Sequence, residues 1–309
     1  MLRQTLIYLS KQQRINDFVR TNFIASRFAS RFVAGDTLDT AVAAVRELHT
    51  KGITATLDLL GESVRTQDEA RSAVAGAISI LEKIAVEKVP ANLSMKLTQL
   101  GFDLDAAEFA AGIRRILDRA KELGIFVRVD MEGSVHTQRT LDLFEKELHP
   151  VYGDGVGIVI QSYLRRSAAD IGRLVEARAK VRLCKGAYLE PATVAFPAKR
   201  DIDGSYVGLA QHLLESGQYH GIATHDAAII EQVKRFAKER GIAPERFEFQ
   251  MLYGIRRDLQ QGLRAEGYNV RVYVPFGTFW YPYFMRRLAE SPSTLFFIPM
   301  SVLKEGFGR

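Results

Sequence analysis

The chain has 309 residues, of which 47% are hydrophobic and 25% are charged. This composition excludes a disordered or collagen-like protein, and the length suffices for one α/β barrel of about 250 residues with an extension. The net charge of +6 comes without a block of Lys or Arg, so we expect no nucleic-acid partner. The single cysteine, Cys184, excludes an intrachain disulfide and fits a reducing compartment.

Transmembrane and secretion signals are not found in the sequence. There is no run of about 18 apolar residues and no signal-peptide pattern, so we expect a cytoplasmic protein. Reversible peripheral contact with the inner face of the cell membrane stays open for a basic protein. The six histidines are scattered and form no HExxH or Cys/His cluster, which predicts no metal site.

Residues 1–50 are predicted to form an N-terminal helical segment, because apolar residues recur there at helical spacing. These residues include Phe18, Phe23, Ile24, Phe28, Phe32 and Val33. From residue 54 onward, eight short β-branched runs are each followed by an amphipathic segment, which is typical of βα units. The predicted strands are 54–60, 92–98, 126–131, 157–163, 181–187, 221–226, 247–252 and 269–276. Helices are predicted at 68–86, 105–123, 135–148 and 229–240.

Eight βα units predict an α/β fold, a (β/α)8 TIM barrel over residues 51–292, followed by an apolar C-terminal tail at 293–309. The alternative is an open doubly wound sheet. No strand leads into the G-x-G-x-x-G loop that is typical of that fold, so the sequence favours the barrel.

Alternate residues of a barrel strand point into the barrel, and here many of them are polar. Buried charges need partners or a ligand. We expect an internal salt-bridge layer formed by the deeper members, Asp58, Arg128, Glu248 and Arg271. Barrel active sites lie at the carboxyl ends of the strands, so the later members are predicted to be functional. They are Lys96, Asp130, Gln161, Lys185, His225, Gln250 and Tyr273.

Two cationic segments suggest anionic ligands. Arg182 and Lys185 flank the end of the fifth predicted strand, where Gly186 allows close approach of a group such as a pyrophosphate. A helix capped by Thr278 carries Arg286 and Arg287, which can together hold a carboxylate. For both segments, ordinary solvated surface cations are the alternative.

Six motifs in this order resemble the bacterial proline dehydrogenases. They are SMKLTQL (94–100), VRVDME (127–132), RLCKGAY (182–188), ATHD (223–226), EFQMLYG (248–254) and YPYFMRRLAE (281–290). The resemblance covers about residues 31–290 and is to the monofunctional enzymes, because no aldehyde dehydrogenase domain accompanies the barrel.

The resemblance implies a distorted (β/α)8 barrel with its final helix across the carboxyl ends of the strands. It also implies FAD as cofactor, oxidation of L-proline to Δ1-pyrroline-5-carboxylate, and a quinone as electron acceptor. The catalytic residues that it implies are Lys96, Asp130, Tyr273, Arg286 and Arg287. The implied substrate-binding residues are Lys96, Leu183, Tyr188, Leu252, Tyr273, Arg286, Arg287 and Glu62, which closes the site by pairing with Arg286. The implied FAD-binding residues are Gln161, Arg182, Lys185, Gly186, Ala187, Thr224, His225, Asp226, Gln250 and Glu290.

Two details and two alternatives remain. Asp226 stands where some relatives carry Asn, and Cys184 replaces an aliphatic residue and is expected to pack as one. A Schiff-base aldolase would use Lys96 or Lys185 as nucleophile, which requires a lysine with a lowered pKa. A non-catalytic adaptor for nucleic acid or membrane is suggested only by the net charge.

Overall fold

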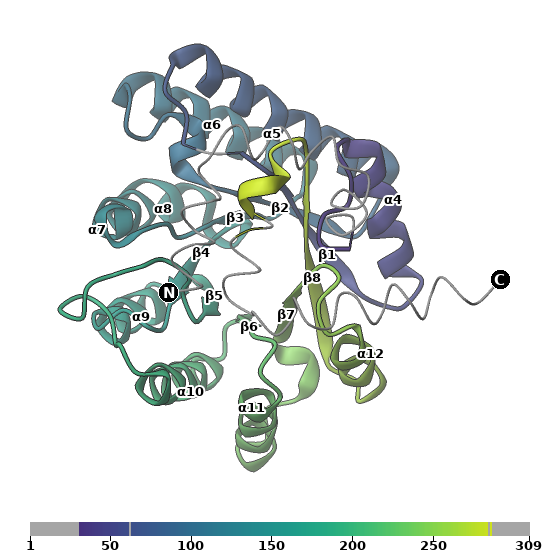
Figure 1. Cartoon of the computed structure of the whole chain (residues 1–309), viewed down its shortest axis with the longest axis vertical. Helices are drawn as coiled ribbons and strands as arrows, with labels where there is room; N and C mark the ends of the chain where they lie inside the picture. The colour runs from purple at the N-terminus through teal and green to yellow at the C-terminus, as the bar shows by residue number, and fades with distance from the viewer. Residues whose placement is uncertain (1–30, 62, 284, 286–309) are drawn as a thin grey trace.

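The computed structural model describes residues 31–61, 63–283 and 285. Eight parallel strands form a closed barrel in sequence order, and β8 pairs with β1. Helices surround the barrel (Figure 1). The predicted (β/α)8 TIM barrel is therefore confirmed, and the open doubly wound sheet is excluded.

The strands are β1 (Thr54–Leu59), β2 (Ala91–Met95), β3 (Val127–Val129), β4 (Val156–Gln161), β5 (Lys180–Cys184), β6 (Gly221–Ala223), β7 (Glu248–Leu252) and β8 (Asn269–Phe276). The α-helices are α4 (Leu38–His49), α5 (Gln67–Glu87), α6 (Ala106–Leu123), α7 (Ser134–Leu143), α8 (His149–Tyr152), α9 (Ser167–Glu176), α10 (Lys199–Glu215), α11 (Ala227–Glu239) and α12 (Arg257–Ala265). A π-helical turn, Phe144–Leu148, joins α7 to α8. Residues 280–283 are helical, as predicted for the segment after Thr278.

Several strands end earlier than predicted. The second prediction ran to Thr98, but β2 ends at Met95, and the chain turns through a 3-10 helix that closes at Gly101 with φ of 89°. Likewise β5 ends at Cys184 and β6 at Ala223, so Lys185 lies in a loop and Asp226 caps α11. In these strands the sequence keeps alternating polar and apolar residues after the backbone has left the sheet. The predicted strands were too long for that reason.

The N-terminal prediction is only partly met in the described residues. Residues 31–37 lie in turns and extended backbone, so Phe32 and Val33 are buried but not helical, and the helix α4 begins at Leu38. Residues 1–30 of the predicted helical segment lie outside the described residues, as does the tail at 293–309. The division of the chain into three segments stays a prediction.

Helix boundaries follow local capping chemistry. Thr66 and Glu69 form a capping box at the start of α5, and Asp105 accepts hydrogen bonds from two backbone N–H groups at the start of α6. Gly124, with φ of 66°, ends α6 in the left-handed conformation that glycine adopts without strain. These helices are consequently set at fixed positions against the barrel.

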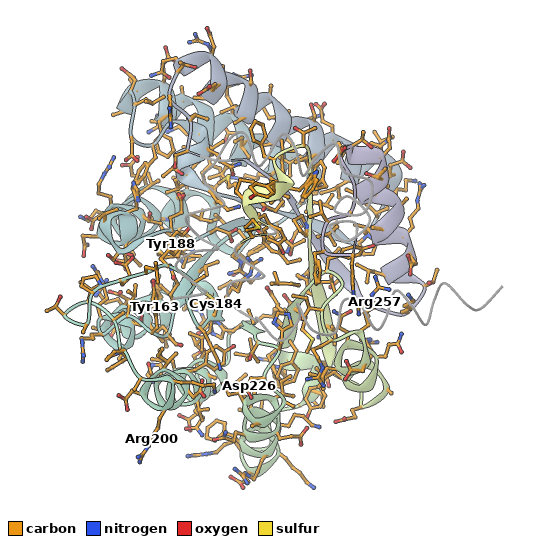
Figure 2. All side chains as sticks on the ribbon, viewed as in Figure 1. Tyr163, Cys184, Tyr188, Arg200, Asp226 and Arg257 are labelled. Carbon is orange, nitrogen blue, oxygen red and sulfur yellow. The ribbon has the colours of Figure 1, made fainter. Side chains whose placement is uncertain are left out.

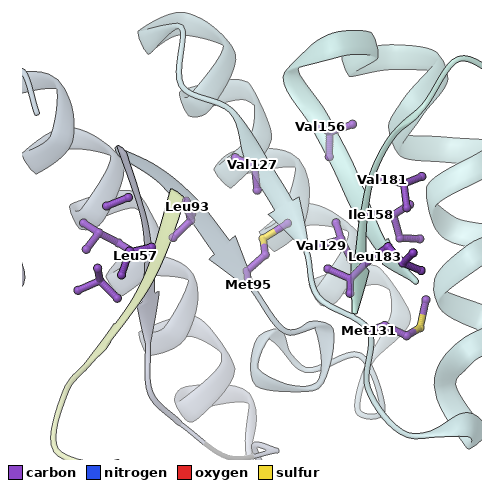
Figure 3. Close-up of a cluster of buried hydrophobic side chains, with 14 of the residues drawn as sticks. Leu57, Leu93, Met95, Val127, Val129, Met131, Val156, Ile158, Val181 and Leu183 are labelled. Atoms are coloured by element: carbon purple, nitrogen blue, oxygen red, sulfur yellow. The ribbon is translucent and has the colours of Figure 1, made fainter. Parts of the chain in front are cut away.

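The main hydrophobic core lies between the barrel wall and the helices. Its side chains come from the apolar parity of the strands, and Figure 3 shows part of it. The labelled residues are Leu57, Leu93, Met95, Val127, Val129, Met131, Val156, Ile158, Val181 and Leu183. Burial of one such side chain contributes about 1.5 to 3 kcal/mol. This outward core leaves the polar parity facing the interior of the barrel, where the site lies.

Candidate active site

Asp130 is the centre of a hydrogen-bond cluster inside the barrel. Its carboxylate accepts bonds from Ser94 Oγ at 2.7 Å, Arg182 Nη1 at 2.8 Å and Tyr273 Oη at 2.9 Å. These donors come from β2, β5 and β8, and Asp130 follows β3 directly. Arg182 also donates through Nε to Gln250 Oε1 at 2.6 Å. The structure thus brings together four of the predicted site residues and adds Ser94, the first residue of the motif 94–100.

Lys96 lies beside this cluster and pairs with Asp58. Its Nζ is 3.0 Å from both carboxylate oxygens of Asp58. Burial works to lower the pKa of Lys96, but the negative charges of Asp58 and Asp130 outweigh it and raise the pKa above its ordinary value. Burial raises the pKa of Asp58. Lys96 is therefore a stable cation at the carboxyl ends of the strands.

Tyr273 contributes a neutral donor to the same cluster. Burial, together with the charge of Asp130, raises the pKa of Tyr273 well above its ordinary value, so the phenol stays protonated. The guanidinium of Arg182 lies over its ring, 5.3 Å from the centroid. We refer to these five residues, Asp58, Lys96, Asp130, Arg182 and Tyr273, as the mouth cluster.

Nearer the amino ends of the strands lies a second charged group, which we call the deep layer. Glu248 accepts bonds from Arg271 Nε at 2.8 and 3.0 Å, as predicted. Burial works to raise the pKa of Glu248, but the adjacent Arg271 holds the pKa below its ordinary value. Arg128 completes the layer; Glu248, Arg271 and Arg128 are its members.

The predicted four-member salt-bridge layer is wrong for two of its members. Asp58 pairs with Lys96, and Arg128 donates to the backbone carbonyls of Ile158 at 3.2 Å and Lys180 at 2.6 Å. Burial, and then the charge of Arg182, lowers the pKa of Arg128 to about 9, which leaves it cationic at neutral pH. Two backbone carbonyls thus bind one Nη of this guanidinium, while its buried Nε has no hydrogen-bond partner among the described residues. The sequence carries no sign of that choice.

A second cluster lies around Lys185 at the rim of the barrel. Lys185 Nζ donates to Asp203 at 2.6 Å and to Asp226 at 3.0 Å, and Lys199 contacts both carboxylates. Asp226 also caps α11 by accepting a bond from a backbone N–H (Figure 2). Asp203 was missed from the sequence because α10 was not predicted. Arg182 was predicted to bind a phosphate together with Lys185. It is instead buried in the mouth cluster.

The backbone after β5 has a shape that only glycine permits. Gly186 has φ of 105°, and a Cβ there would lie 2.2 Å from the Tyr163 ring. Nearby, Gln161 donates through Nε2 to the Glu132 carbonyl at 2.8 Å. Its buried Oε1 has no hydrogen-bond partner among the described residues. An acceptor of this kind is available to a donor on a ligand.

The remaining predicted residues divide into four groups. Leu252, Thr224 and His225 end or follow β7 and β6, where His225 Nε2 accepts a bond from Leu252 N at 2.9 Å. Ala187 and Tyr188 lie in the loop after β5, and Tyr188 is exposed. Leu183 is fully buried in the core on the opposite parity from Arg182, so the structure does not bring it to the cluster (Figure 3). Outside the described residues lie Glu62, Arg286, Arg287 and Glu290, whose roles stay predictions.

Neither a metal-binding cluster nor a membrane-spanning helix is found in the described part of the chain. Within it, no group of three or more His, Cys, Asp or Glu side chains could hold a metal ion. None of its helices has the length and apolar character needed to cross a membrane. Cys184 is half-buried and packs against the main core, in keeping with an aliphatic role.

Charged side chains gathered at the carboxyl ends of eight parallel strands place the chain in the class of TIM-barrel enzymes. The family model described as "Proline dehydrogenase" matches residues 41–298. The chain belongs to the proline dehydrogenase family.

Relatives agree with this assignment. A "Proline dehydrogenase" of Deinococcus radiodurans is 40% identical over 307 residues, covering 98% of each chain. "Proline dehydrogenase 1" of Bacillus subtilis is 40% identical over 305 residues, covering 99% of this chain and 100% of that protein. Among solved structures, proline utilization A (PutA) from Bdellovibrio bacteriovorus inactivated by N-propargylglycine has a TM-score of 0.81 and 24% identity. The match covers 92% of this chain and 38% of the PutA chain, and it shows that the two share a fold.

Proposed function

We propose that this protein is an FAD-dependent proline dehydrogenase that oxidises L-proline to Δ1-pyrroline-5-carboxylate and uses a quinone as electron acceptor. The observation that carries the proposal is the mouth cluster, found here in a member of the proline dehydrogenase family. In this cluster Lys96 is a stable cation paired with Asp58, and the neighbouring carboxylate of Asp130 holds Arg182 and Tyr273 in place. A cation at this position suits the carboxylate of an amino acid substrate.

The residues around β4 to β7 fit a flavin nucleotide. The unpartnered Oε1 of Gln161 can accept a bond, and Lys185 offers an ammonium group to an anionic phosphate. Gly186 lies in the same loop as Lys185, and there the Tyr163 ring occupies the space that a side chain would take. Thr224 and His225 follow β6, and Gln250 lies within the adjacent strand β7. When bound, the flavin supplies the acceptor for the hydride removed from the substrate.

The chain's own residues do the positioning. Lys96 is held by Asp58, so its ammonium group is already ordered before a substrate carboxylate arrives, which lowers the entropic cost of binding. Arg286 and Arg287 are proposed to bind the same carboxylate, with Glu62 closing over it. Asp130 fixes Tyr273 and Arg182 through hydrogen bonds and so shapes the surface against which the ring rests.

The aldolase alternative is disfavoured by the chemistry of Lys96. A Schiff-base nucleophile needs a lowered lysine pKa, whereas Asp58 and Asp130 raise the pKa of Lys96. Borohydride trapping on a keto substrate tests this alternative directly, and we expect no covalent adduct.

A visible absorption spectrum of the purified protein, before and after anaerobic L-proline, tests the proposal. We expect a yellow protein that bleaches near 450 nm, roughly the usual flavin maximum. A colourless protein, or a yellow one that L-proline does not bleach, would contradict it. Transfer of electrons from the reduced protein to NAD but not to a soluble quinone analogue would contradict the proposed acceptor.

The proposed location is the cytoplasm, with reversible contact at the membrane surface through the apolar tail at 293–309. Binding to anionic vesicles should be weak, salt-sensitive and reduced by deletion of residues 294–309 with the flavin retained. Loss of the fold or of an oligomer on deletion would instead make the tail structural.

A further inference from the structure

The loop between β5 and α10 carries a carboxylate that reaches a neighbouring helix. Glu190 accepts hydrogen bonds from both the backbone N–H, at 2.7 Å, and the Oγ of Ser134, the first residue of α7. The two residues are 56 positions apart in the chain. This contact, which we call the loop clip, therefore joins the β5–α10 loop to the start of α7.

The clip replaces a missing local cap. The N-cap of α7 is Gly133, which has no side chain to accept a bond from the first turn of the helix. Unpaired N–H groups at a helix start carry partial positive charge, and a carboxylate there is stabilised by it. Glu190 is thus held by both a directional bond and a favourable field, so the loop is fixed at this point.

Tyr188 lies two residues before Glu190 and packs on the same glycine. A Cβ on Gly133 would lie 3.6 Å from Glu190 Oε1 and 3.9 Å from Tyr188 Cδ1. Burial works to lower the pKa of Lys96, the carboxylates of Asp58 and Asp130 raise it, and the Tyr188 phenol adds a smaller rise, so Tyr188 lies within electrostatic reach of Lys96. Figure 2 shows Tyr188 and Tyr163 on the side of the barrel that α7 to α10 cover.

The loop between β5 and α10 also packs on an aromatic ring. The Tyr163 ring fills the space where Gly186 would carry a side chain, so the backbone just before Tyr188 rests on that ring. Further along, Arg165 donates to the Ala192 carbonyl at 2.9 Å, and Leu164 bridges Ala195. The loop is therefore held at both flanks of Tyr188, and Glu190 is the attachment that faces α7.

We propose that Glu190 is a positioning residue that holds Tyr188 over the substrate site through the loop clip. It deepens the proposed function, on which it rests, because Tyr188 is proposed there to line the proline site. Glu190 itself touches neither substrate nor cofactor. It acts by restricting the positions that the Tyr188 ring can take, so its loss weakens substrate binding more than turnover.

Kinetics of three clip variants test the proposal. Glu190→Ala removes both bonds, Glu190→Gln keeps a neutral acceptor, and Ser134→Ala keeps the backbone bond. We expect Glu190→Ala to raise KM for L-proline about 10-fold with kcat changed less than about 3-fold, and the other two to raise it less. Val135→Ala is the control, since this side chain is exposed on α7 beside Ser134. Unchanged KM in all three clip variants would overturn the proposal.

A double-mutant cycle separates positioning from general stability. If Glu190 acts through the Tyr188 ring, adding Glu190→Gln to Tyr188→Ala should raise KM much less than Glu190→Gln does alone. Independent, multiplying effects would overturn the proposal. Should Glu190→Ala fail to fold, Glu190→Gln and Ser134→Ala carry the test.

Failure of the proposed function is distinguishable from failure of the clip. If the wild type neither binds flavin nor oxidises proline, the proposed function is wrong, and with it the role of the clip in catalysis. If the wild type is active, amide hydrogen exchange of residues 186–190, Ala192 and Ser134 should be faster in Glu190→Gln than in the wild type. Unchanged exchange would show that the contact does not hold the loop.

Discussion

The barrel interior holds two groups of charged side chains that satisfy their hydrogen bonds in different ways. In the deep layer, besides the pair of Glu248 with Arg271, the two arginines donate to backbone carbonyls of Ile158, Lys180 and Ala55, whose positions the sheet fixes. The mouth cluster is held by bonds between side chains. Side chains can exchange one partner for another, whereas a carbonyl in a barrel wall cannot move away. The mouth cluster can therefore admit a ligand, and the deep layer serves the fold.

The largest expected effect is on stability and comes from the deep layer. Glu248→Ala leaves Arg271, whose side chain is only 17% exposed, without its carboxylate, which should lower the free energy of unfolding by about 3 to 5 kcal/mol. Urea unfolding measures it. The matched control is Glu266→Ala, which removes a half-exposed partner of Lys234 and should lower it by less than about 1 kcal/mol. Equal losses in both variants would remove the distinction between a buried and a surface pair.

Lys96→Met should affect substrate binding more than stability. Loss of a charged hydrogen bond to the substrate carboxylate costs about 1.5 to 3 kcal/mol, so KM for L-proline should rise roughly 10- to 150-fold. Stability should change less, because Asp58, whose pKa burial already raises, can take up a proton when its partner is lost. Lys51→Met, at a surface pair with Glu47, is the control. A large loss of stability without a change in KM would place Lys96 with the deep layer.

A third prediction concerns pH and the amino end of the barrel. Burial, and then the charge of Arg128, lowers the pKa of His220 from 6.5 to about 3. Below pH 6.5 the unfolded chain binds a proton that the folded protein does not, so stability falls as pH falls. By about pH 5 the loss should approach 2 kcal/mol. His220→Gln should flatten this pH dependence between about pH 6.5 and 5, and exposed His49→Gln should not. An unchanged slope in His220→Gln would contradict the assignment.

The smallest effect is expected for Ser94→Ala. This change removes one of the three donors to Asp130 and leaves Arg182 and Tyr273 in place. We expect a loss of about 1 kcal/mol in kcat/KM for L-proline, roughly 5-fold, with the melting temperature nearly unchanged. A loss as large as that of Lys96→Met would show that Ser94 has a more direct role.

The fold was predictable from the sequence because each βα unit repeats the same pattern, and β8 was predicted with the boundaries that the structure shows. The inward parity of Lys96, Asp130 and Tyr273 was predictable for the same reason. Their partners were not. Which carboxylate Arg182 reaches depends on the width of the barrel, which the sequence does not state. The segment 182–188 instead favoured a role for Arg182 in binding an anionic ligand such as a pyrophosphate.

The loop clip illustrates the same limit. Glu190 and Ser134 lie far apart in sequence, and neither belongs to a motif that links them. Gly133 before a helix was the available signal, because an uncapped helix start needs an acceptor from elsewhere. That signal indicates that a partner exists and leaves its identity open.

The pairing of β1 with β8 also bears on how the chain is made. Six residues of β1 lie opposite β8, from Thr54 to Leu59, and Ala34 N donates to Pro275 O at 2.9 Å. During synthesis, the edge of β1 that pairs with β8 stays unpaired until β8, the last strand, has left the ribosome. An unpaired edge is a site for aggregation, so the nascent protein depends on chaperone protection or fast closure until its final strand emerges.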